Sequence, residues 1–431
     1  MRILNALVVG VSLTAALAFA GGEEKVSEKD WNAVHNAGFE ADQQQNHLEA
    51  VEYFKQSWHL ARTIAERGAS ANDIGQAYRE LGQAKEAKEW LERACSIWRM
   101  EPQGSHYLSV SASSLGDLYR DAGDYARAEA LWREALAAEH HDLASADMIR
   151  NALGDLLREQ GRFIEAEALL TESFHHDGNA WQQRVNALTG LADIARQKGD
   201  WRSSEEKWNE ALAIAHEQND RNTEAIATRG LASMWVSAGN LARAEPLFRR
   251  ALSIVESIPE AKPDQRASVL SGLAEVYRAQ NKLALAEDAW SEALRIDRAS
   301  FGEVHPQVAF LTEMLADVYS ARGEQELALD YATRAVEAMK GLFGENKLPT
   351  AVALANRATV EQRGNQLDAA AGDFEHALSI VREERKEERG NDLIEKAMTE
   401  RYASLLKSMH RNREAKALTA SSLSSNALSF R

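Results

Sequence analysis

The feature that most constrains this chain is a repeat, in which one small residue is followed twelve positions later by another. The pattern returns about ten times, at intervals of 37 to 45 residues. Its first members are Gly38, Gly75, Gly116, Gly154, Ala192, Ala232, Ala274, Ala316, Ala358 and Ala403. A period in this range is typical of solenoids, whose units bury their apolar faces only against their neighbours. The 431-residue chain is therefore predicted to form one stack of units and not three separate domains.

Each unit has the pattern of two helices joined by a tight turn. Apolar residues follow helical spacing, and a residue that tolerates left-handed backbone closes the first helix. These turn residues are Gly82, Gly123, Gly161, Gly199, Gly239, Asn281 and Gly323. A second amphipathic helix follows, as in ARAEALWREAL (126–136), with a large apolar residue four positions after the second small one. We predict that these large residues plug the gap to the next unit: Trp132, Leu170, Trp208, Phe248, Trp290 and Phe374.

This skeleton, Leu-Gly/Ala-x-x-Tyr followed by Ala, an aromatic residue and Ala, resembles the tetratricopeptide repeat (TPR). The later units resemble the longer, 42-residue variety typified by kinesin light chains, in stretches such as AEPLFRRALSI (244–254) and FGEVHPQVA (301–309). The resemblance implies an all-α, right-handed α-α solenoid over about residues 31–420. The end units depart from the pattern, with Gln45 and His410 at their turns, and we interpret them as caps. Arg357 departs too, because the other central units have a leucine or isoleucine there.

The two ends of the chain are predicted to lie outside the solenoid. Residues 1–20 combine Arg2, an apolar stretch and a small-x-small cleavage pattern ending at Ala20, which indicates a signal peptide and export to a bacterial envelope compartment. Retention of this segment as an anchor is the alternative. Residues 21–30 are expected to be a linker, and the serine-rich residues 421–431 a C-terminal tail. The formal net charge of −16 argues against nucleic acid as a partner.

Acid and arginine recur three residues apart in the first helix of successive units, in LGDLYRDAG (115–123), LGDLLREQG (153–161) and LADIARQKG (191–199). When the first small residue is numbered 8, these pairs occupy positions 9 and 12. In proteins that this chain resembles, positions 2, 5, 9 and 12 line a concave groove. The resemblance therefore implies a stripe of position-12 arginines in that groove: Arg79, Arg120, Arg158, Arg196 and Arg278.

Two interpretations of this stripe remain open. In the structural one, each arginine stabilises the stack by pairing with Asp117, Asp155 or Asp193 in its own unit or an adjoining one. In the functional one, the arginines bind carboxylates of a protein or peptide partner, with Asn72 and Asn151 bonding its backbone. An acidic segment or a free C-terminus would suit such a wall. The carboxylate clamp of the family is not reproduced, because acids stand at position 9 and position 5 has no lysine.

The sequence contains no catalytic motif of the HExxH, GxSxG or Walker type, so we expect a non-enzymatic scaffold without a cofactor. One alternative function is a metal-binding accessory or sensor protein of the cell envelope. It rests on His140-His141-Asp142 and His175-His176-Asp177, near the ends of second helices in adjacent units. Histidines near a helix C-terminus also complement the helix dipole, and the two copies are out of register by three residues.

Overall fold

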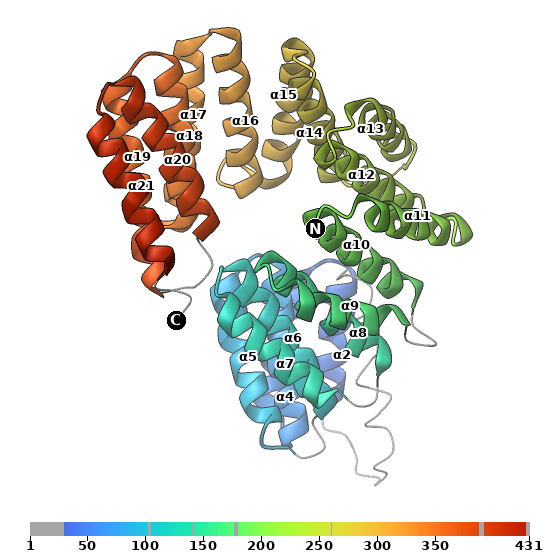
Figure 1. Cartoon of the computed structure of the whole chain (residues 1–431). Coiled ribbons are helices and arrows are strands. Elements are labelled where there is room, and N and C mark those ends of the chain that lie inside the picture. The colour runs from blue at the N-terminus through green and yellow to red at the C-terminus, as the bar shows by residue number, and fades with distance from the viewer. Residues whose placement is uncertain are drawn as a thin grey trace. The chain divides into compact units, whose positions relative to one another are not determined.

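The structure is a computed structural model that describes residues 30–101, 105–139, 142–175, 180–259, 261–387 and 392–427. Every regular element within these ranges is an α-helix, which confirms the predicted fold class (Figure 1). The helices are α2 (Trp31–Gln43), α3 (His47–Leu60), α4 (Ile64–Glu80), α5 (Ala84–Trp98), α6 (Ser105–Asp121), α7 (Tyr125–Ala138), α8 (Leu143–Glu159), α9 (Phe163–His175), α10 (Trp181–Gln197), α11 (Trp201–Glu217), α12 (Arg221–Ser237), α13 (Leu241–Glu256), α14 (Pro263–Ala279), α15 (Leu283–Phe301), α16 (Pro306–Arg322), α17 (Gln325–Phe343), α18 (Leu348–Arg363), α19 (Leu367–Glu387), α20 (Asp392–Ser408) and α21 (Asn412–Ala427).

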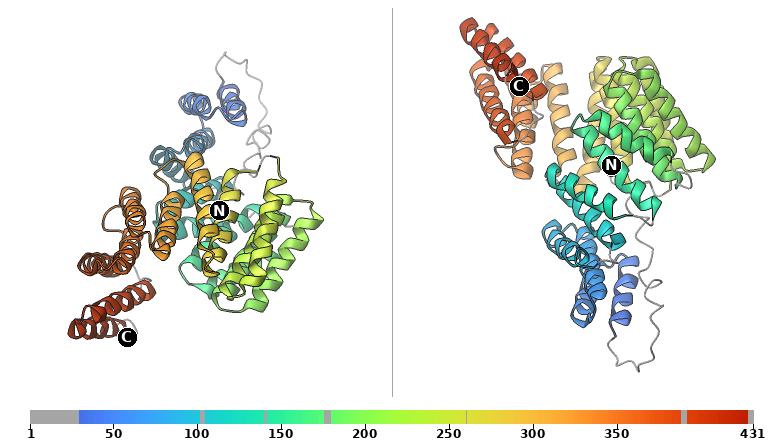
Figure 2. Two further views of the ribbon diagram at one scale, coloured as in Figure 1. Left: turned by 90° about the horizontal axis from the view of Figure 1, so that it is seen from above. Right: turned by 60° about the horizontal axis from the view of Figure 1, so that its bottom comes forward.

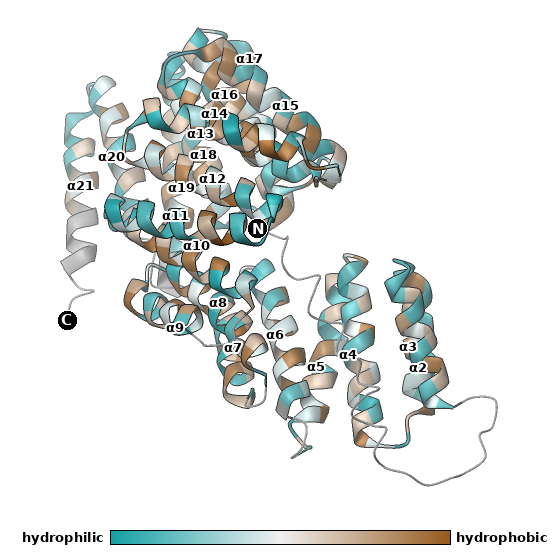
Figure 3. Cartoon of the chain, turned by 90° about the vertical axis from the view of Figure 1, so that its right-hand side faces the viewer, coloured by the Kyte–Doolittle hydropathy of each residue, from teal (hydrophilic) through white to brown (hydrophobic). Residues whose placement is uncertain are grey.

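Successive helices form pairs, each with an even-numbered first helix and an odd-numbered second helix (Figure 2). The chain divides into two compact units, one ending at Leu191 and the other beginning at Ala192, within α10. Each unit is a stack in which every pair packs against the next, so each is an α-solenoid. Hydrophobic and hydrophilic residues alternate along the helices, as expected where one side of each helix is buried (Figure 3).

The turn within each pair has the left-handed residue that the sequence predicts. All seven predicted turn residues have positive φ, from 59° at Asn281 to 81° at Gly323. Gln45 and His410, at the turns of the degenerate end units, adopt the same conformation with φ of 60°. A glycine there avoids the steric cost that a Cβ atom brings, so these two turns carry strain that the glycine turns lack.

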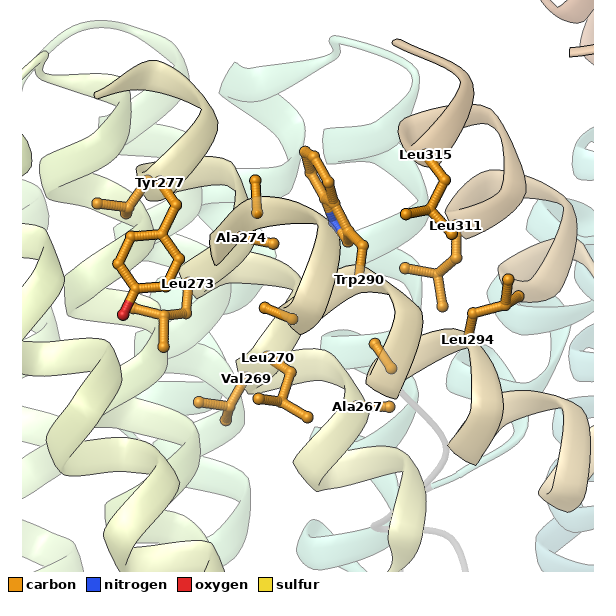
Figure 4. Close-up of a cluster of buried hydrophobic side chains, with 14 of the residues drawn as sticks. Ala267, Val269, Leu270, Leu273, Ala274, Tyr277, Trp290, Leu294, Leu311 and Leu315 are labelled. Carbon is orange, nitrogen blue, oxygen red and sulfur yellow. The ribbon is translucent and has the colours of Figure 1, made fainter. Parts of the chain in front are cut away.

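The seam between successive pairs is closed by the six predicted plug residues, all of which are buried. In the α14/α15 pair, Trp290 lies between Ala274 of its own first helix and Leu311 and Leu315 of the next one (Figure 4). Its indole nitrogen donates to Ser271 Oγ at 3.2 Å. The plug prediction is confirmed, because one large side chain fills the space between two neighbouring pairs.

Small residues on both sides of the seam make room for the plugs. Within the α6/α7 pair, a Cβ on Gly116 at position 8 would meet the ring of that pair's own plug, Trp132. At position 6 of the α14/α15 pair, a Cβ on Gly272 would meet the ring of Phe248, the plug of the preceding pair. Close packing therefore limits the residue size at these glycine positions.

Arg357 is accommodated by a second departure from the repeat. Its guanidinium makes two hydrogen bonds to the carboxylate of Asp373, at 2.6 Å and 2.8 Å. Asp373 lies on the second helix of the same pair, α19, where the preceding pair has Tyr331. A charged pair thus replaces two apolar side chains, and Glu361 lies nearby at 3.9 Å from Arg357 Nε.

Candidate functional site

First helices of successive pairs lie side by side within each unit. Direct contacts join α2 to α4 and α4 to α6 in the first unit, and α12 to α14 and α16 to α18 in the second. We call the residues at positions 2, 5, 9 and 12 of all the even-numbered first helices, from α2 to α20, the first-helix face. It contains all ten residues that the sequence singles out for partner binding.

Two of the five predicted arginines bridge successive first helices. Arg79 Nη1 on α4 lies 3.5 Å from Asp117 Oδ2 on α6. Arg278 Nη1 on α14 lies 3.6 Å from Asp317 Oδ2 on α16. Asp317 also accepts a hydrogen bond from Arg363 Nη1 on α18 at 2.7 Å. These ion pairs join the first helices of successive helix pairs, as the structural interpretation predicts.

Two other arginines pair with the acid three residues earlier on the same helix. Arg158 Nε lies 3.4 Å from Asp155 Oδ1, and Arg196 Nε lies 3.1 Å from Asp193 Oδ1. Arg196 also donates to Ser237 Oγ on α12 at 3.3 Å. The side chain of Arg158 is only 9% exposed, whereas that of Arg278 is 42% exposed.

The fifth arginine, Arg120, has a different set of neighbours. Its Nη2 lies 3.4 Å from Asp121 Oδ1, and its guanidinium lies over the ring of Trp132. Burial raises the pKa of the Asp117 carboxyl above its ordinary value, while Arg120 and Arg79 act in the opposite direction. The charged form of Asp117 is therefore favoured by these two arginines.

The two predicted asparagines are buried and bond to neighbouring helices. Asn72 accepts a hydrogen bond from Ser111 Oγ on α6 at 2.9 Å and donates to Asp73 Oδ1 at 3.0 Å. Asn151 donates to the backbone carbonyl of Gln183 on α10 at 3.0 Å. Both amides are thus engaged within the protein, and their role in binding a partner remains a prediction.

A polar chain that the sequence did not single out crosses three first helices of the second unit. Asn356 on α18 donates to Glu313 Oε1 on α16 and accepts from Arg401 on α20, at 3.0 Å for Nη1. Burial raises the pKa of the Glu313 carboxyl to about 7, although Asn356 and Arg401 favour its charged form. Glu313 stands at position 5, where Glu400 of the last pair is the other acid, and an acid at this position is the signal that could have marked it.

Arg229 on α12 is a second residue that the prediction left out. It also stands at position 5, where the other pairs carry small side chains, His35, Glu313 or Glu400. Its guanidinium makes no hydrogen bond, ion pair or ring contact with any residue in the described part of the chain. Burial lowers its pKa from the ordinary arginine value, and Asp193 is the charge that acts in the opposite direction.

The histidine-rich turns lie mostly outside the described residues, which exclude His140, His141, His176 and Asp177. Of the remaining two, Asp142 caps α8 by accepting a hydrogen bond from the Ala144 backbone at 3.0 Å. Across the described ranges, no three His, Cys, Asp or Glu side chains gather in a group that could hold a metal ion. None of the helices in those ranges combines the length and apolar character needed to span a bilayer.

Comparison with protein families finds two matches that together cover most of the repeats. The family model described as MalT-like TPR region matches residues 41–261, which is more than half of the chain. A tetratricopeptide repeat model matches residues 265–341. No curated protein matches the chain in sequence.

Solved structures with the same helix-pair architecture share little sequence with this chain. A Rap protein complexed with Competence and Sporulation Factor is 12% identical with a TM-score of 0.57, over 83% of this chain and 99% of that one. A tetratricopeptide repeat protein from Parabacteroides merdae ATCC 43184 is 17% identical with a TM-score of 0.51, over 66% and 98% of the two chains. Repeats of a putative kinesin light chain from Podosopora anserina are 18% identical with a TM-score of 0.42, over 47% and 97%. The two structures with TM-scores above 0.5 share the fold of this chain, and at such low sequence identity the similarity extends to the fold alone.

Proposed function

The chain belongs to the tetratricopeptide repeat family, and we propose that it is an exported, non-enzymatic scaffold that binds a protein or peptide partner on its first-helix face. The seams between pairs are filled by apolar plugs that reach no solvent, so they serve the stack itself. The first-helix face instead carries charged groups beside half-buried apolar ones such as Val110, Met148 and Ile226 at position 2.

The single observation that carries the proposal is that the arginines on this face differ in how far their side chains are exposed to solvent. Arg158 is nearly enclosed and pairs with Asp155, whereas Arg120 and Arg278 keep about a third or more of their side chains exposed. An exposed guanidinium beside an apolar side chain suits a carboxylate next to a hydrophobic residue of a partner. The Rap protein of the same fold holds Competence and Sporulation Factor, so the fold is compatible with a bound partner.

The envelope location is the other part of the proposal. It is supported by the cleavage pattern ending at Ala20 and by a single cysteine, Cys95, which is buried in the structure. A chain without an internal disulfide depends on packing for its stability in an oxidising compartment. Fractionation of the source cells and N-terminal sequencing test this part, and a cytoplasmic chain that retains Met1 would contradict it.

Capture from an envelope extract tests partner binding, with the wild-type chain compared with an Arg120→Gln, Arg278→Gln double variant. In this variant Asp117 keeps Arg79 and Asp317 keeps Arg363, while Asp121 loses its contact with Arg120 but is 47% exposed to solvent. The variant should therefore fold and melt like the wild type. We expect it to lose a partner that the wild type retains, with weaker capture at higher salt.

The matched control is Arg202→Gln, Arg295→Gln, which removes the same charge from second helices. Their side chains are 90% and 67% exposed and pair only with acids on their own helix, Glu206 and Glu292. The control should retain every partner. If the first-helix variant and the control retain the same partners, the first-helix face is not the binding surface.

A further inference from the structure

Among the described residues, most polar side chains at position 5 of the first-helix face bond to a neighbouring group, and Arg229 does not. Asn72, Asn151, Thr189, Ser271 and Glu313 each make a hydrogen bond with a neighbouring group. Arg229 has a long basic side chain at the same place and bonds to none of the described residues. The stack does not require a cation at this position, because the other pairs close without one.

Asp193, the acid that acts on the pKa of Arg229, already accepts a hydrogen bond from Arg196. Asp193 Oδ1 accepts from Arg196 Nε at 3.1 Å, and no ion pair joins Asp193 to Arg229 among the described contacts. Arg229 is half-buried, and burial lowers its pKa. Removing a cation from water without a bonded partner is costly, so such groups in proteins are normally matched by an anion.

The surroundings of Arg229 on α12 are apolar or neutral. Ile226, Ser233 and Val236 share its side of the helix, since they lie three residues before it and four and seven residues after it. All three are half-buried. An anion at Arg229 would therefore meet the Arg229 cation, the Ser233 hydroxyl and two apolar side chains, in a setting where an ion pair is stronger than in water. The acid that acts on Arg229 from α10 is Asp193, and its charge is already paired with Arg196.

We propose that Arg229 is the anchor for a carboxylate of the bound partner, with Ile226 and Val236 contacting the apolar residues beside that carboxylate. This inference rests on the proposed function and specifies it, because it assigns the central contact to a residue outside the arginine stripe. The ligand is an extended peptide, and its carboxylate is either the free C-terminus or an Asp or Glu side chain.

The test begins with selection of peptides from a library displayed with free C-termini against the full chain. The strongest binders are synthesised in three forms: unchanged, with an amidated C-terminus, and with each Asp or Glu replaced by Asn or Gln. Their dissociation constants are measured by fluorescence anisotropy against wild type, Arg229→Gln, Arg229→Lys and Arg202→Gln. Comparison of the amidated and amide-substituted forms identifies which carboxylate is bound.

We expect one of the two peptide changes, and Arg229→Gln, each to weaken binding about tenfold or more, with no further loss when they are combined. Arg229→Lys should lie between wild type and Arg229→Gln because it keeps the charge and loses the planar fork. Arg202→Gln should have no effect. Additive losses, or a carboxylate dependence that persists in Arg229→Gln, would overturn the assignment while leaving peptide binding in place. A library without any binder would overturn peptide recognition itself, and with it this inference.

Discussion

The seams between helix pairs and the first-helix face repeat at the same interval, yet they tolerate different residues. At the seam, the six predicted plug residues are all Trp, Phe or Leu, and each is buried. On the face, position 5 holds amides, hydroxyls, an alanine, His35, two acids and Arg229. A plug is constrained from two sides by neighbouring backbones, whereas a face residue has solvent on one side. Departures on the face are therefore informative about binding, and departures at the seam are first a matter of packing.

The largest effect is expected at the seam. Trp290→Ala removes a side chain that is 1% exposed and leaves a cavity between α14 and α16, so the free energy of unfolding should fall by about 3–5 kcal/mol. Phe310→Ala removes an aromatic side chain from position 2 of the face, where it is 43% exposed, and should cost less than about 1 kcal/mol. Urea unfolding measures both, and equal losses would remove the distinction between seam and face.

A smaller effect separates glycines that make room for a plug from glycines that do not. Gly272→Ala places a Cβ against the ring of Phe248 and should destabilise the chain by about 1–3 kcal/mol. Gly372→Ala, in α19, places a Cβ in open space and should stabilise it by about 0.5–1 kcal/mol. Thermal melts of the two variants should shift in opposite directions, and a shared direction would contradict the packing account.

The pH dependence of the free energy of unfolding tests whether the ionised form of a face residue, Glu313, destabilises the folded chain. Burial raises the pKa of Glu313 to about 7, so the folded chain binds this proton more tightly than the unfolded chain does. Stability from this group is therefore present below the unfolded pKa of about 4.5 and is lost as pH rises toward 7. Glu313→Gln should remove a decline of about 1–2 kcal/mol between pH 4.5 and 7.5, after allowance for its partial exposure. Urea unfolding across this range measures it, and an unchanged pH profile would show that Glu313 titrates normally.

The smallest effect concerns the turns of the end units. Gln45→Gly relieves a side chain at φ of 60° and should raise stability by about 0.5–1 kcal/mol. Gly161→Ala makes the reverse change at φ of 73° and should lower it by a similar amount. Differential scanning calorimetry resolves both. A loss in Gln45→Gly would mean that the glutamine side chain is needed at that turn.

The sequence predicted the seams and turns well because each depends on residues inside one repeat. The turn glycines, Asn281 and the plugs stand at fixed places relative to the small residues, and their geometry follows from helix spacing. Arg357 could be recognised as a departure, but its partner Asp373 could not, since the pair forms across two helices of one unit. The division into two compact units within α10 also left no mark in the repeat pattern.

The face was predicted less completely because its contacts depend on which side chains reach the next helix. Five arginines at position 12 have the same sequence signature, yet Arg79 and Arg278 pair with an acid on the next first helix while Arg158 and Arg196 pair with an acid on their own helix. Rotamer choices in neighbouring pairs decide this, and no single repeat contains them. Arg229 stands out in the opposite way, because an arginine occurs at position 5 in one pair alone. A search for recurring residues therefore does not detect it.

The most direct test of the account is the free energy of unfolding of Arg229→Met, measured by urea denaturation without added peptide. If the first-helix face is shaped by binding, replacing this arginine by an apolar side chain of similar length should leave stability unchanged or raise it. A fall of more than about 1 kcal/mol would show that Arg229 stabilises the stack, and the face would then be a structural lattice like the seam.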